Sequence, residues 1–341
     1  MKRPTHIHGW GTSHKGAPLE RMEKEIPALA GHEVLLKVMA CGICHSDVHL
    51  IDDDWNFTPY PLIPGHEIVG HVIEKGAEVK HLSCGTIVGV GWQRGACLQC
   101  DDCVSGRENM CDGRTATCVE HWGGFADYHV TDSRFCFPIP KELKPEEAAP
   151  LMCGGATVFS PLCEFLPLKM HRTARVGVIA LGGLGHLAVK MAAHMGYDVT
   201  LFSSSEKKQQ AAESMGARHF VPSNKASEIR KLGRNLDLIL VTANADLPWN
   251  TYLETLRSDG TLCFVGVPPS SLSVQVFELL GKRLRVVASP IGSRHDISRM
   301  LEFCARHKIT AATELFPLEK VNEGLKRVRE GSVRFRAVLI P

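Results

Sequence analysis

The stretch RVGVIALGGLGHLAVKMAAHMG, residues 175–196, decides the fold of the second half of this chain. It opens with an apolar run typical of a buried strand, continues through a glycine-rich turn and ends in small and apolar residues at helical spacing. Strand-like and helical runs then alternate as far as Ser289. Because this βαβ rhythm places crossover helices between parallel strands, we expect a doubly wound parallel sheet.

The glycines of the turn indicate what this sheet binds. Gly182 lets the backbone approach a pyrophosphate, Gly185 lets helix and strand pack closely, and the helix amide groups face the phosphates. The pattern departs from G-x-G-x-x-G at its first position, where Ala180 stands. Since strand, turn and helix occur together, we predict a dinucleotide site. Its turn residues are Gly182, Gly183, Leu184 and Gly185.

The end of the next strand-like run indicates which dinucleotide is bound. A carboxylate there would accept hydrogen bonds from a ribose 2′-hydroxyl, and the sequence has none. The residues present are neutral or basic: Ser203, Ser204, Ser205, Lys207 and Lys208. They can hydrogen-bond and neutralise a 2′-phosphate, so we expect NADP(H), with NAD(H) as the alternative. That alternative stays open because the serines can also cap a helix starting at Glu206, and Glu206 is itself negative.

The first part of the chain has a different pattern. Val- and Ile-rich runs such as GTIVGVGW alternate with Gly and Pro, which predicts short strands in a barrel-like domain. Acidic residues and helix-compatible spacing begin near Pro145. We therefore expect an α/β protein with a mostly β domain over 1–152, a dinucleotide-binding domain over 153–291, and a C-terminal segment, 292–341, that returns to the first domain.

Composition excludes several classes of protein. The 341 residues are 44% hydrophobic and 22% charged, as in globular proteins, and the length favours two domains. A net charge of +2 provides no basic field for nucleic acid or a membrane surface, so we expect a small-molecule partner. The chain has no signal-like start and no run approaching the ~20 apolar residues of a membrane span. Thirteen cysteines without an export signal favour metal-binding thiols in the cytoplasm.

Four of these cysteines are close together in QRGACLQCDDCVSGRENMC: Cys97, Cys100, Cys103 and Cys111. The C-x2-C-x2-C-x7-C spacing lets a turning loop direct all four sulfurs at one zinc ion, and four thiolates leave no open coordination position. We therefore expect a structural zinc site, with disulfides or free thiols as the alternatives. A nucleic-acid-binding zinc ribbon is disfavoured because the loop is acidic, with Asp101, Asp102, Glu108 and Asp112.

A second set of candidate ligands is dispersed along the chain. Cys44, His66 and Cys153 offer two thiolates and one imidazole, a set that leaves the fourth position of zinc open for water or substrate. Their separation in the sequence permits any arrangement. The residues alone therefore do not distinguish a metal site from ordinary buried side chains.

Taken together, five motifs resemble those of zinc-dependent medium-chain alcohol dehydrogenases, most closely the cinnamyl alcohol dehydrogenase-like branch of aldehyde reductases. They are CGICHSD at 41–47, GHE at 65–67, the four-cysteine loop, LMCGGAT at 151–157 and LGGLGH at 181–186. The resemblance runs in the same order from about Gly9 to Val338. It implies a GroES-like catalytic domain, a Rossmann domain, and one catalytic and one structural zinc ion per chain. We also expect a homodimer or homotetramer.

The resemblance assigns roles around the dispersed ligands. It implies that Cys44, His66 and Cys153 bind the catalytic zinc, with Glu67 as a transient fourth ligand. Asp47 then accepts the free N–H of His66, caps the helix begun by CHSD, or does both. A polyol-type relative would usually carry a carboxylate at position 153, so cysteine there favours simple alcohols and aldehydes.

The resemblance also implies a reaction and a proton relay. Zinc acts as a Lewis acid toward the oxygen of a primary alcohol or aldehyde, and hydride passes between substrate and nicotinamide C4. Ser46 and His49 relay the proton, with a helix-start hydroxyl and a surface imidazole as the alternatives. Further cofactor contacts are His45, Thr157, Gly266, Val267 and Arg336, with Arg334 as the rival of Arg336. An NAD-preferring alcohol dehydrogenase is the runner-up, and a zinc-free quinone reductase would not need the three ligands.

Substrate recognition is the least determined feature. Trp55 and Trp92 are candidates for an aromatic pocket, with core packing as the alternative. His121 and Trp122 stand where relatives usually have polar residues before a Gly-Gly pair, and the segment after Cys111 is shorter than in the plant enzymes. We therefore do not transfer a lignin-type substrate and expect a broad reductase of aliphatic and aromatic aldehydes.

Overall fold

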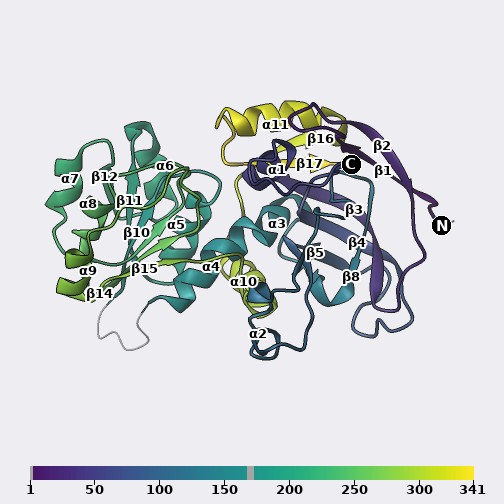
Figure 1. The fold of residues 1–341 in the computed structure, drawn as a ribbon, viewed down its shortest axis with the longest axis horizontal. Helices are drawn as coiled ribbons and strands as arrows, with labels where there is room; N and C mark the ends of the chain where they lie inside the picture. The colour runs from purple at the N-terminus through teal and green to yellow at the C-terminus, as the bar shows by residue number, and fades with distance from the viewer. Residues whose placement is uncertain (1–2, 167–172) are drawn as a thin grey trace. The chain divides into compact units, whose positions relative to one another are not determined.

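The computed structural model describes residues 3–166 and 173–341, and the chain forms two compact units. Unit 1 comprises Met1–Gly154 and Ser293–Pro341, and unit 2 comprises Gly155–Gly292 (Figure 1). Each division lies within two residues of a boundary expected from the sequence.

Unit 1 is built on a seven-stranded sheet with the order β16-β17-β3-β4-β5-β9, in which β8 also pairs with β3. β16 and β17 are parallel, and the other pairs are antiparallel. The strands are β3 (Glu33–Ile43), β4 (Glu67–Lys75), β5 (Ile87–Val90), β8 (Tyr128–Asp132), β9 (Phe137–Pro138), β16 (Thr313–Pro317) and β17 (Arg336–Ile340). Because β17 pairs with β3, the C-terminal segment belongs to the sheet of unit 1 (Figure 1).

Smaller elements complete unit 1. Two two-stranded sheets are formed by β1 (His6–Gly11) with β2 (Glu20–Glu25) and by β6 (Gln93–Gly95) with β7 (Thr115–Ala116). The helices are α1 (His45–Ile51), α2 (Asp101–Val104), α3 (Pro145–Ala148), α10 (Arg294–His307) and α11 (Val321–Arg329). The 3-10 turns are η1 (Glu108–Met110), η2 (Ser133–Phe135), η3 (Ala149–Met152) and η5 (Leu318–Lys320).

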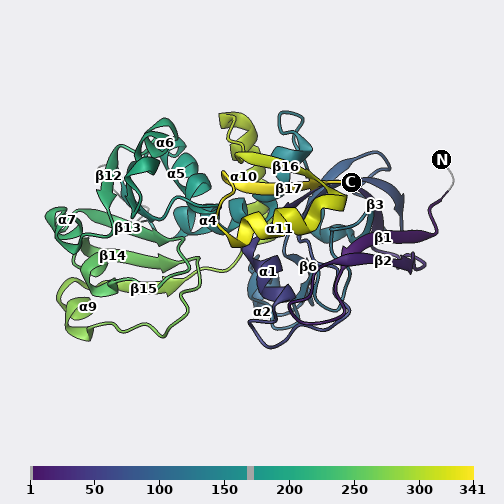
Figure 2. The same ribbon diagram turned by 90° about the horizontal axis from the view of Figure 1, so that it is seen from above.

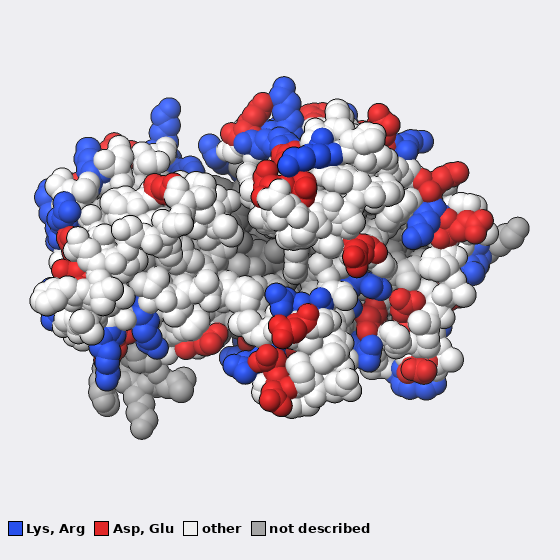
Figure 3. All heavy atoms as spheres, in the orientation of Figure 1, with Lys and Arg blue, Asp and Glu red and all other residues white. Residues whose placement is uncertain are grey.

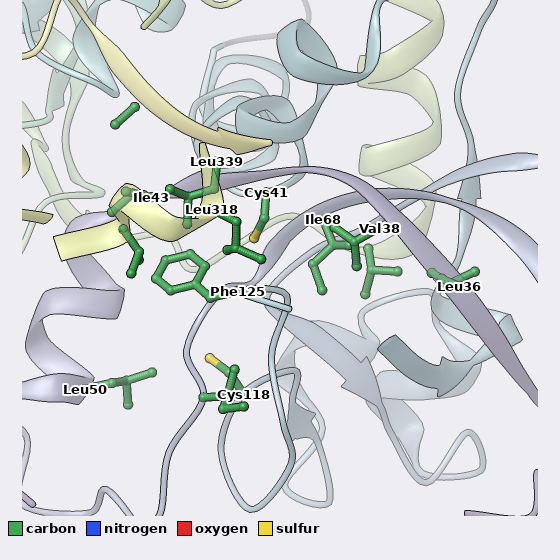
Figure 4. Packing of buried hydrophobic residues seen from close by; sticks show 14 of the residues in the cluster. Leu36, Val38, Cys41, Ile43, Leu50, Ile68, Cys118, Phe125, Leu318 and Leu339 are labelled. Carbon is green, nitrogen blue, oxygen red and sulfur yellow. The ribbon is translucent and has the colours of Figure 1, made fainter. Parts of the chain in front are cut away.

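The core of unit 1 is an apolar cluster that joins the sheet to segments distant in the sequence. Figure 4 shows the buried ring of Phe125 among side chains from β3, β17 and η5, including Cys41, Leu339 and Leu318. Cys118 belongs to the same cluster and has no exposed surface. Burial of this many apolar groups is the main stabilising contribution to such a unit.

Unit 2 is a six-stranded parallel sheet with the order β12-β11-β10-β13-β14-β15. The strands are β10 (Arg175–Ile179), β11 (Asp198–Ser203), β12 (His219–Pro222), β13 (Leu236–Val241), β14 (Leu256–Phe264) and β15 (Arg285–Ala288). The helices are α4 (Gly154–Glu164), α5 (Gly185–His194), α6 (Gln209–Ser214), α7 (Ala226–Lys231), α8 (Trp249–Leu253) and α9 (Val276–Lys282), with η4 (Glu206–Lys208) before α6 (Figure 2).

The pattern of burial explains why these sequences form a parallel sheet. Every residue of β13 is buried, as expected for a central strand covered by helices on both faces. The strand order reverses between β10 and β13, and in open sheets of this kind ligands bind outside the carboxyl ends of the strands at that point. The predicted fold class, α/β with a mostly β domain and a doubly wound parallel sheet, is confirmed.

Surface charges and thiols agree with the composition. On the face shown in Figure 3, basic and acidic side chains are interspersed over both units, in line with a net charge of +2. All thirteen cysteines lie in the described residues as free thiols, so the structure contains no disulfide among them. None of the helices within 3–166 and 173–341 has the length and apolarity needed to cross a bilayer.

Candidate active site

Three elements of unit 1 bring the dispersed ligand candidates together. Cys44 follows β3 and precedes α1, His66 directly precedes β4, and Cys153 directly follows η3. One ligand atom from each of these residues and from Glu67 lies within 4.8 Å of all the others. The sequence could not show this meeting, because it depends on the pairing of β3 with β4 and on the position of η3 beside both strands.

The donor set fits a zinc ion. The Nε2 atom of His66 is buried and forms no hydrogen bond with any described residue. A buried polar atom without a partner is costly, and a metal ion removes that cost. Hydrogen bonding between the two thiols lowers the pKa of Cys44 well below its usual range and raises that of Cys153. A cation bound by both sulfurs would replace the proton that they share.

Asp47, in the first turn of α1, forms hydrogen bonds to the residues of this cluster. Its Oδ1 accepts from Nδ1 of His66 and from the backbone N–H of Gly65, both at 2.9 Å. Its Oδ2 accepts from the backbone N–H of Cys44 at 2.8 Å, closing a capping box on α1. The two roles considered for Asp47 are therefore compatible, because each uses a different oxygen. One fully buried carboxylate orients both Cys44 and His66.

Glu67 lies between the ligand cluster and Arg336. One of its oxygens, Oε1, pairs with the buried Arg336 guanidinium, and Oε2 forms no hydrogen bond with a described residue. Burial raises the pKa of Glu67 to about 7, although the positive charge of Arg336 acts in the opposite direction. A Cβ at Gly42 would collide with Oε2, so the glycine on β3 makes room for the carboxylate. Arg334, the rival of Arg336 as a cofactor contact, is exposed, and the cofactor contact of either arginine stays a prediction.

The four-cysteine loop forms a second, separate cluster. The sulfurs of Cys97, Cys100, Cys103 and Cys111 lie within 4.8 Å of one another. The loop differs from the first cluster in burial: Cys97 is exposed and Cys100 half-buried, while Cys103 and Cys111 are buried. Two backbone features shape it, a left-handed residue at Leu98 and the start of α2 directly after Cys100. Four thiols at this separation fit a tetrahedral zinc ion.

The predicted relay residues lie on α1, and the structure adds a partner that sequence reasoning missed. Nδ1 of His49 is 2.7 Å from Oδ2 of Asp54, and the His49 side chain is 27% exposed. Since a carboxylate only accepts, Nδ1 carries the proton and Nε2 is left as the basic nitrogen. The signal in the sequence was the run of aspartates at 52–54, but nothing in it distinguishes the third aspartate from the other two. Ser46 is half-buried in the first turn of the same helix.

Aromatic side chains cover the ligand cluster on one side. The ring of Trp92 is 4.9 Å from that of His66 at 83°, and Trp55 is 6.1 Å from Trp92 at 81°. Phe57 stacks on Trp55 at 5.6 Å and is 52% exposed. Both tryptophans also pack against the core of unit 1. The core alternative therefore holds for both residues, and their role in a substrate pocket stays a prediction. His45, a candidate cofactor contact, is exposed, with its ring 5.3 Å from that of His49.

In unit 2, the glycine turn joins β10 to α5. A Cβ at Gly185 would collide with the carbonyl oxygen of Ala180, so close packing of the helix on the strand requires glycine there. A Cβ at Gly182 would meet no described atom within 4 Å, so glycine at 182 leaves room for something other than the protein. Ala180 has a φ of 76°, in the left-handed region that costs a residue with a Cβ roughly 1–2 kcal/mol. Ala180, which replaces the first glycine of the pattern, therefore still adopts a backbone conformation typical of glycine.

The candidate 2′-phosphate residues lie at the carboxyl end of β11. Ser203 ends the strand and accepts through Oγ from the N–H of Ser205 at 3.3 Å. Ser205 is the N-cap of η4 but makes no side-chain capping bond. Nζ of Lys208 donates to the carbonyl of Leu181 in the glycine turn at 3.0 Å. The lysine thus joins the two parts of the predicted cofactor site, while Ser204 and Lys207 are exposed.

The remaining candidate cofactor contacts lie elsewhere in unit 2. Thr157 is half-buried in α4, and Gly266 and Val267 follow β14. The N–H of Val267 donates to Oδ1 of Asn244 at 3.3 Å, and its side chain is 66% exposed. A Cβ at Gly266 would press on the carbonyl of Ala243. Nothing in these contacts tests a cofactor role, which stays a prediction for Thr157, Gly266 and Val267.

A strand-rich unit with a two-thiolate, one-imidazole cluster and a four-thiolate loop, joined to a doubly wound unit, defines the class of two-domain metal-dependent dehydrogenases. Residues 30–141 match the alcohol dehydrogenase GroES-like domain, and residues 183–306 match the zinc-binding dehydrogenase family. The chain belongs to the zinc-binding alcohol dehydrogenase family with a GroES-like domain, which confirms the resemblance seen in the motifs.

Comparison with individual proteins agrees with this membership. The chain is 39% identical to the aldehyde reductase AdhA of Synechocystis sp. over 98% of each protein. Its structure is similar to that of a cinnamyl alcohol dehydrogenase from Sorghum bicolor, with a TM-score of 0.92, 34% identity and coverage of 98% and 97% of the two chains. It is also similar to a Helicobacter pylori CAD in complex with NADP(H), with a TM-score of 0.90, 31% identity and 98% coverage of both chains.

Proposed function

We propose that this protein is a zinc-dependent oxidoreductase that interconverts primary alcohols and aldehydes with NADP(H), its two units being the catalytic and the dinucleotide-binding domains. The observation that carries the proposal is the meeting of Cys44, His66 and Cys153, with a buried His66 Nε2 that lacks a partner among the described residues. The relatives support it, because one is named an aldehyde reductase and another was solved with NADP(H).

The three residues of the cluster would hold the catalytic zinc, with Oε2 of Glu67 as a nearby fourth donor. When bound, zinc supplies Lewis acidity toward the oxygen of the alcohol or aldehyde. Asp47 keeps the proton of His66 on Nδ1, so that Nε2 is the nitrogen left for the metal. Arg336 offsets the negative charge that Glu67 adds beside two sulfur ligands.

The proton of the alcohol would leave through Ser46 and His49. The imidazole has one nitrogen held by Asp54 and is partly exposed, so its free Nε2 can take up a proton and exchange it with water. Asp54 therefore acts by setting the tautomer of His49.

For the cofactor, the turn residues Gly182, Gly183, Leu184 and Gly185 would bind the pyrophosphate through backbone amides. Lys208 and the serines at 203–205 would bind the 2′-phosphate. The bond from Nζ of Lys208 to the carbonyl of Leu181 holds the lysine beside the glycine turn. A charged hydrogen bond contributes about 1.5–3 kcal/mol. Lys208→Ala should therefore weaken the binding of NADPH by roughly 10-fold or more and leave the binding of NADH nearly unchanged.

The four-cysteine loop would hold a second, structural zinc ion. Buried Glu108 secures the loop to the rest of unit 1, since its Oε1 pairs with Nε of Arg294 at 3.2 Å and its carbonyl accepts from Gln93 at 2.8 Å. A closed four-thiolate site has no position for substrate. We assign this zinc to stability and the dispersed cluster to catalysis.

Self-association would occur through unit 2. β15 is the edge strand of its sheet, and α9 just before it exposes three apolar side chains, Val276 at 65%, Phe277 at 82% and Leu280 at 75%. Unpaired strand edges and exposed apolar surface favour association, and two identical edges can pair about a twofold axis. Sedimentation should show a dimer or a tetramer, and Phe277→Glu should shift it toward monomer. A monomeric parent protein would refute this assignment.

The test of the proposed function is a kinetic comparison of cofactors and substrates. We expect NADPH to be preferred over NADH in kcat/KM with aliphatic and aromatic aldehydes, and a polyol to react poorly in the reverse direction. Lys231→Ala is the control for Lys208→Ala, because Lys231 is an exposed lysine of unit 2 that pairs with Glu228. A clear preference for NADH would favour the NAD-dependent alternative. The cytoplasmic location also stays a prediction.

A further inference from the structure

The carbonyl of Trp122 is bound by two histidine rings at once. Nδ1 of His121 is 3.0 Å from this oxygen, and Nδ1 of His129, on β8, is 3.1 Å from it. The two rings lie 5.4 Å apart at 81°. Because a carbonyl oxygen only accepts, both Nδ1 atoms must carry the proton. His121 and Trp122 are the residues that depart from the usual pattern before Gly123, and this bond is what they form.

Burial keeps both rings neutral. His129 has no exposed surface, and its Nε2 forms no hydrogen bond with a described residue. Burial lowers the pKa of His121 to about 4 and that of His129 well below its usual range, and Arg94 adds repulsion to both. Lys24 faces His121 from β2 with the same sign. Two neutral N–H donors thus hold one carbonyl without adding charge to the interior.

The Trp122 carbonyl directly precedes residues 123–125. These residues hydrogen-bond to the backbone of residues 63–65, which directly precede His66. The N–H groups of residues 123–125 donate in turn to the carbonyls of Ile63 at 2.8 Å, Gly65 at 2.8 Å and Pro64 at 3.0 Å. A Cβ at Gly123 would collide with the carbonyls of Pro64 and Gly65, so the two segments are in direct backbone contact. The Phe125 ring that ends the segment is buried in the core shown in Figure 4.

Two routes connect this segment to the ligand His66. On one, Gly65 and His66 both donate to Oδ1 of Asp47 at 2.9 Å. On the other, His121 Nδ1 also lies 3.3 Å from the carbonyl of Thr117, whose N–H donates to the carbonyl of Trp92 at 2.7 Å. The Trp92 ring contacts the His66 ring edge to face. The backbone before His66 and the ring beside it are thus both tied to the histidine pair.

We propose that His121 and His129 are positioning residues that hold the Trp122 carbonyl and, through residues 123–125, orient His66 for metal binding. The proposal rests on the proposed role of His66 as a zinc ligand. The test therefore measures zinc retention, which does not require turnover. It can be carried out even on a protein that binds zinc but reduces no aldehyde.

The experiment compares two substitutions at each histidine. His129→Asn keeps an N–H donor near the position of Nδ1, and His129→Leu removes it. Partners that orient a ligating histidine typically affect metal affinity by 10–100-fold. We expect His129→Leu to release one of two zinc ions to a chromogenic chelator roughly 10-fold faster or more, with the second ion released at the parental rate. His129→Asn should stay near the parental rate.

His121→Leu and His121→Asn repeat the comparison at the more accessible ring and carry the test if His129→Leu does not fold. His81→Leu is the matched control, since Nε2 of His81 lies 3.0 Å from the carbonyl of Ser133, outside this segment. Parental zinc release in the folded leucine variants would overturn the proposal. Equal acceleration in the leucine and asparagine variants would also overturn it, because ring packing rather than the N–H donor would then be responsible.

Discussion

The ligand cluster of unit 1 and the glycine turn of unit 2 are built from different parts of the chain. The cluster uses buried side chains delivered by three elements and oriented by the fully buried Asp47. The proposed cofactor turn would use backbone amides and the space left at Gly182. A site made of a few side-chain atoms has no substitute for any of them, whereas amide groups remain after most substitutions. Single changes should therefore be severe in the first site and mild in the second, provided that the glycines at 182 and 185 are kept.

Removal of one sulfur from the cluster should have the largest effect. Because a catalytic metal contributes several kcal/mol of transition-state stabilisation, Cys44→Ser should lower turnover by about a thousandfold or more. Metal analysis should show a fall from about two zinc ions per chain to about one, since the four-cysteine loop is unchanged. Cys84→Ser, at an exposed thiol, is the control and should behave as the parent. Retained turnover in Cys44→Ser would refute the site.

A change one step further from the metal should have an intermediate effect. Asp47→Asn keeps the shape but weakens the acceptor for Nδ1 of His66, so zinc affinity should fall by roughly 10–100-fold. Competition with a chelator of known affinity measures this. Asp101→Asn, at an exposed carboxylate of the four-cysteine loop, should leave the catalytic zinc unchanged. If both variants retained the catalytic zinc equally well, the orienting role of Asp47 would be wrong.

The histidine pair His121 and His129, whose pKa values are lowered by burial, should make the stability of unit 1 sensitive to acid. An unfolded histidine has a pKa of about 6.5 and folded His121 one of about 4, so between these values the unfolded chain binds more protons than the folded one. The free energy of unfolding therefore falls as the pH falls through this window, by up to about 2 kcal/mol from pH 7 to pH 5 for this ring. Denaturant unfolding should show a smaller loss in His121→Asn. An identical pH dependence in parent and variant would contradict the assignment.

The smallest effect is expected in the glycine turn. Ala180→Gly removes the strain of a left-handed alanine and should stabilise the protein by roughly 1 kcal/mol, reduced by the extra freedom of glycine in the unfolded chain. NADPH affinity should change little. Ala211→Gly, in the ordinary helix α6, should instead destabilise by about 1 kcal/mol. Thermal unfolding of the parent protein and the two variants shows whether each substitution raises or lowers stability. Destabilisation by both substitutions would show that Ala180 is not strained.

The accuracy of sequence reasoning depended on how local each feature is. The strand, turn and helix at 175–196 are contiguous, so pattern and turn chemistry were sufficient to predict their structure. The four cysteines occupy one loop, and their spacing alone allowed their sulfurs to converge. Cys44, His66 and Cys153 came from a resemblance, because no local rule relates residues on three separate elements.

Some hydrogen-bond and ion-pair partners could not be predicted from the sequence for the same reason. Asp54 could not be distinguished from its two neighbours until α1 and the following turn placed it against His49. Arg336, the first residue of β17, is buried and pairs with Glu67, whereas Arg334 lies before the strand and is exposed, and no pattern in the sequence separates the two. His129 reaches the carbonyl of Trp122 from β8, a strand whose position is set by its pairing with β3.

The sequence by itself determined the doubly wound sheet, the glycine turn and the four-cysteine loop, because periodicity and short spacings act within a few residues of each other. The tertiary structure decided which distant side chains share the ligand cluster, which acid orients His49, and that two neutral histidines hold the segment leading to His66. Those contacts are set by strand pairing and burial, which bring together residues that the chain keeps far apart.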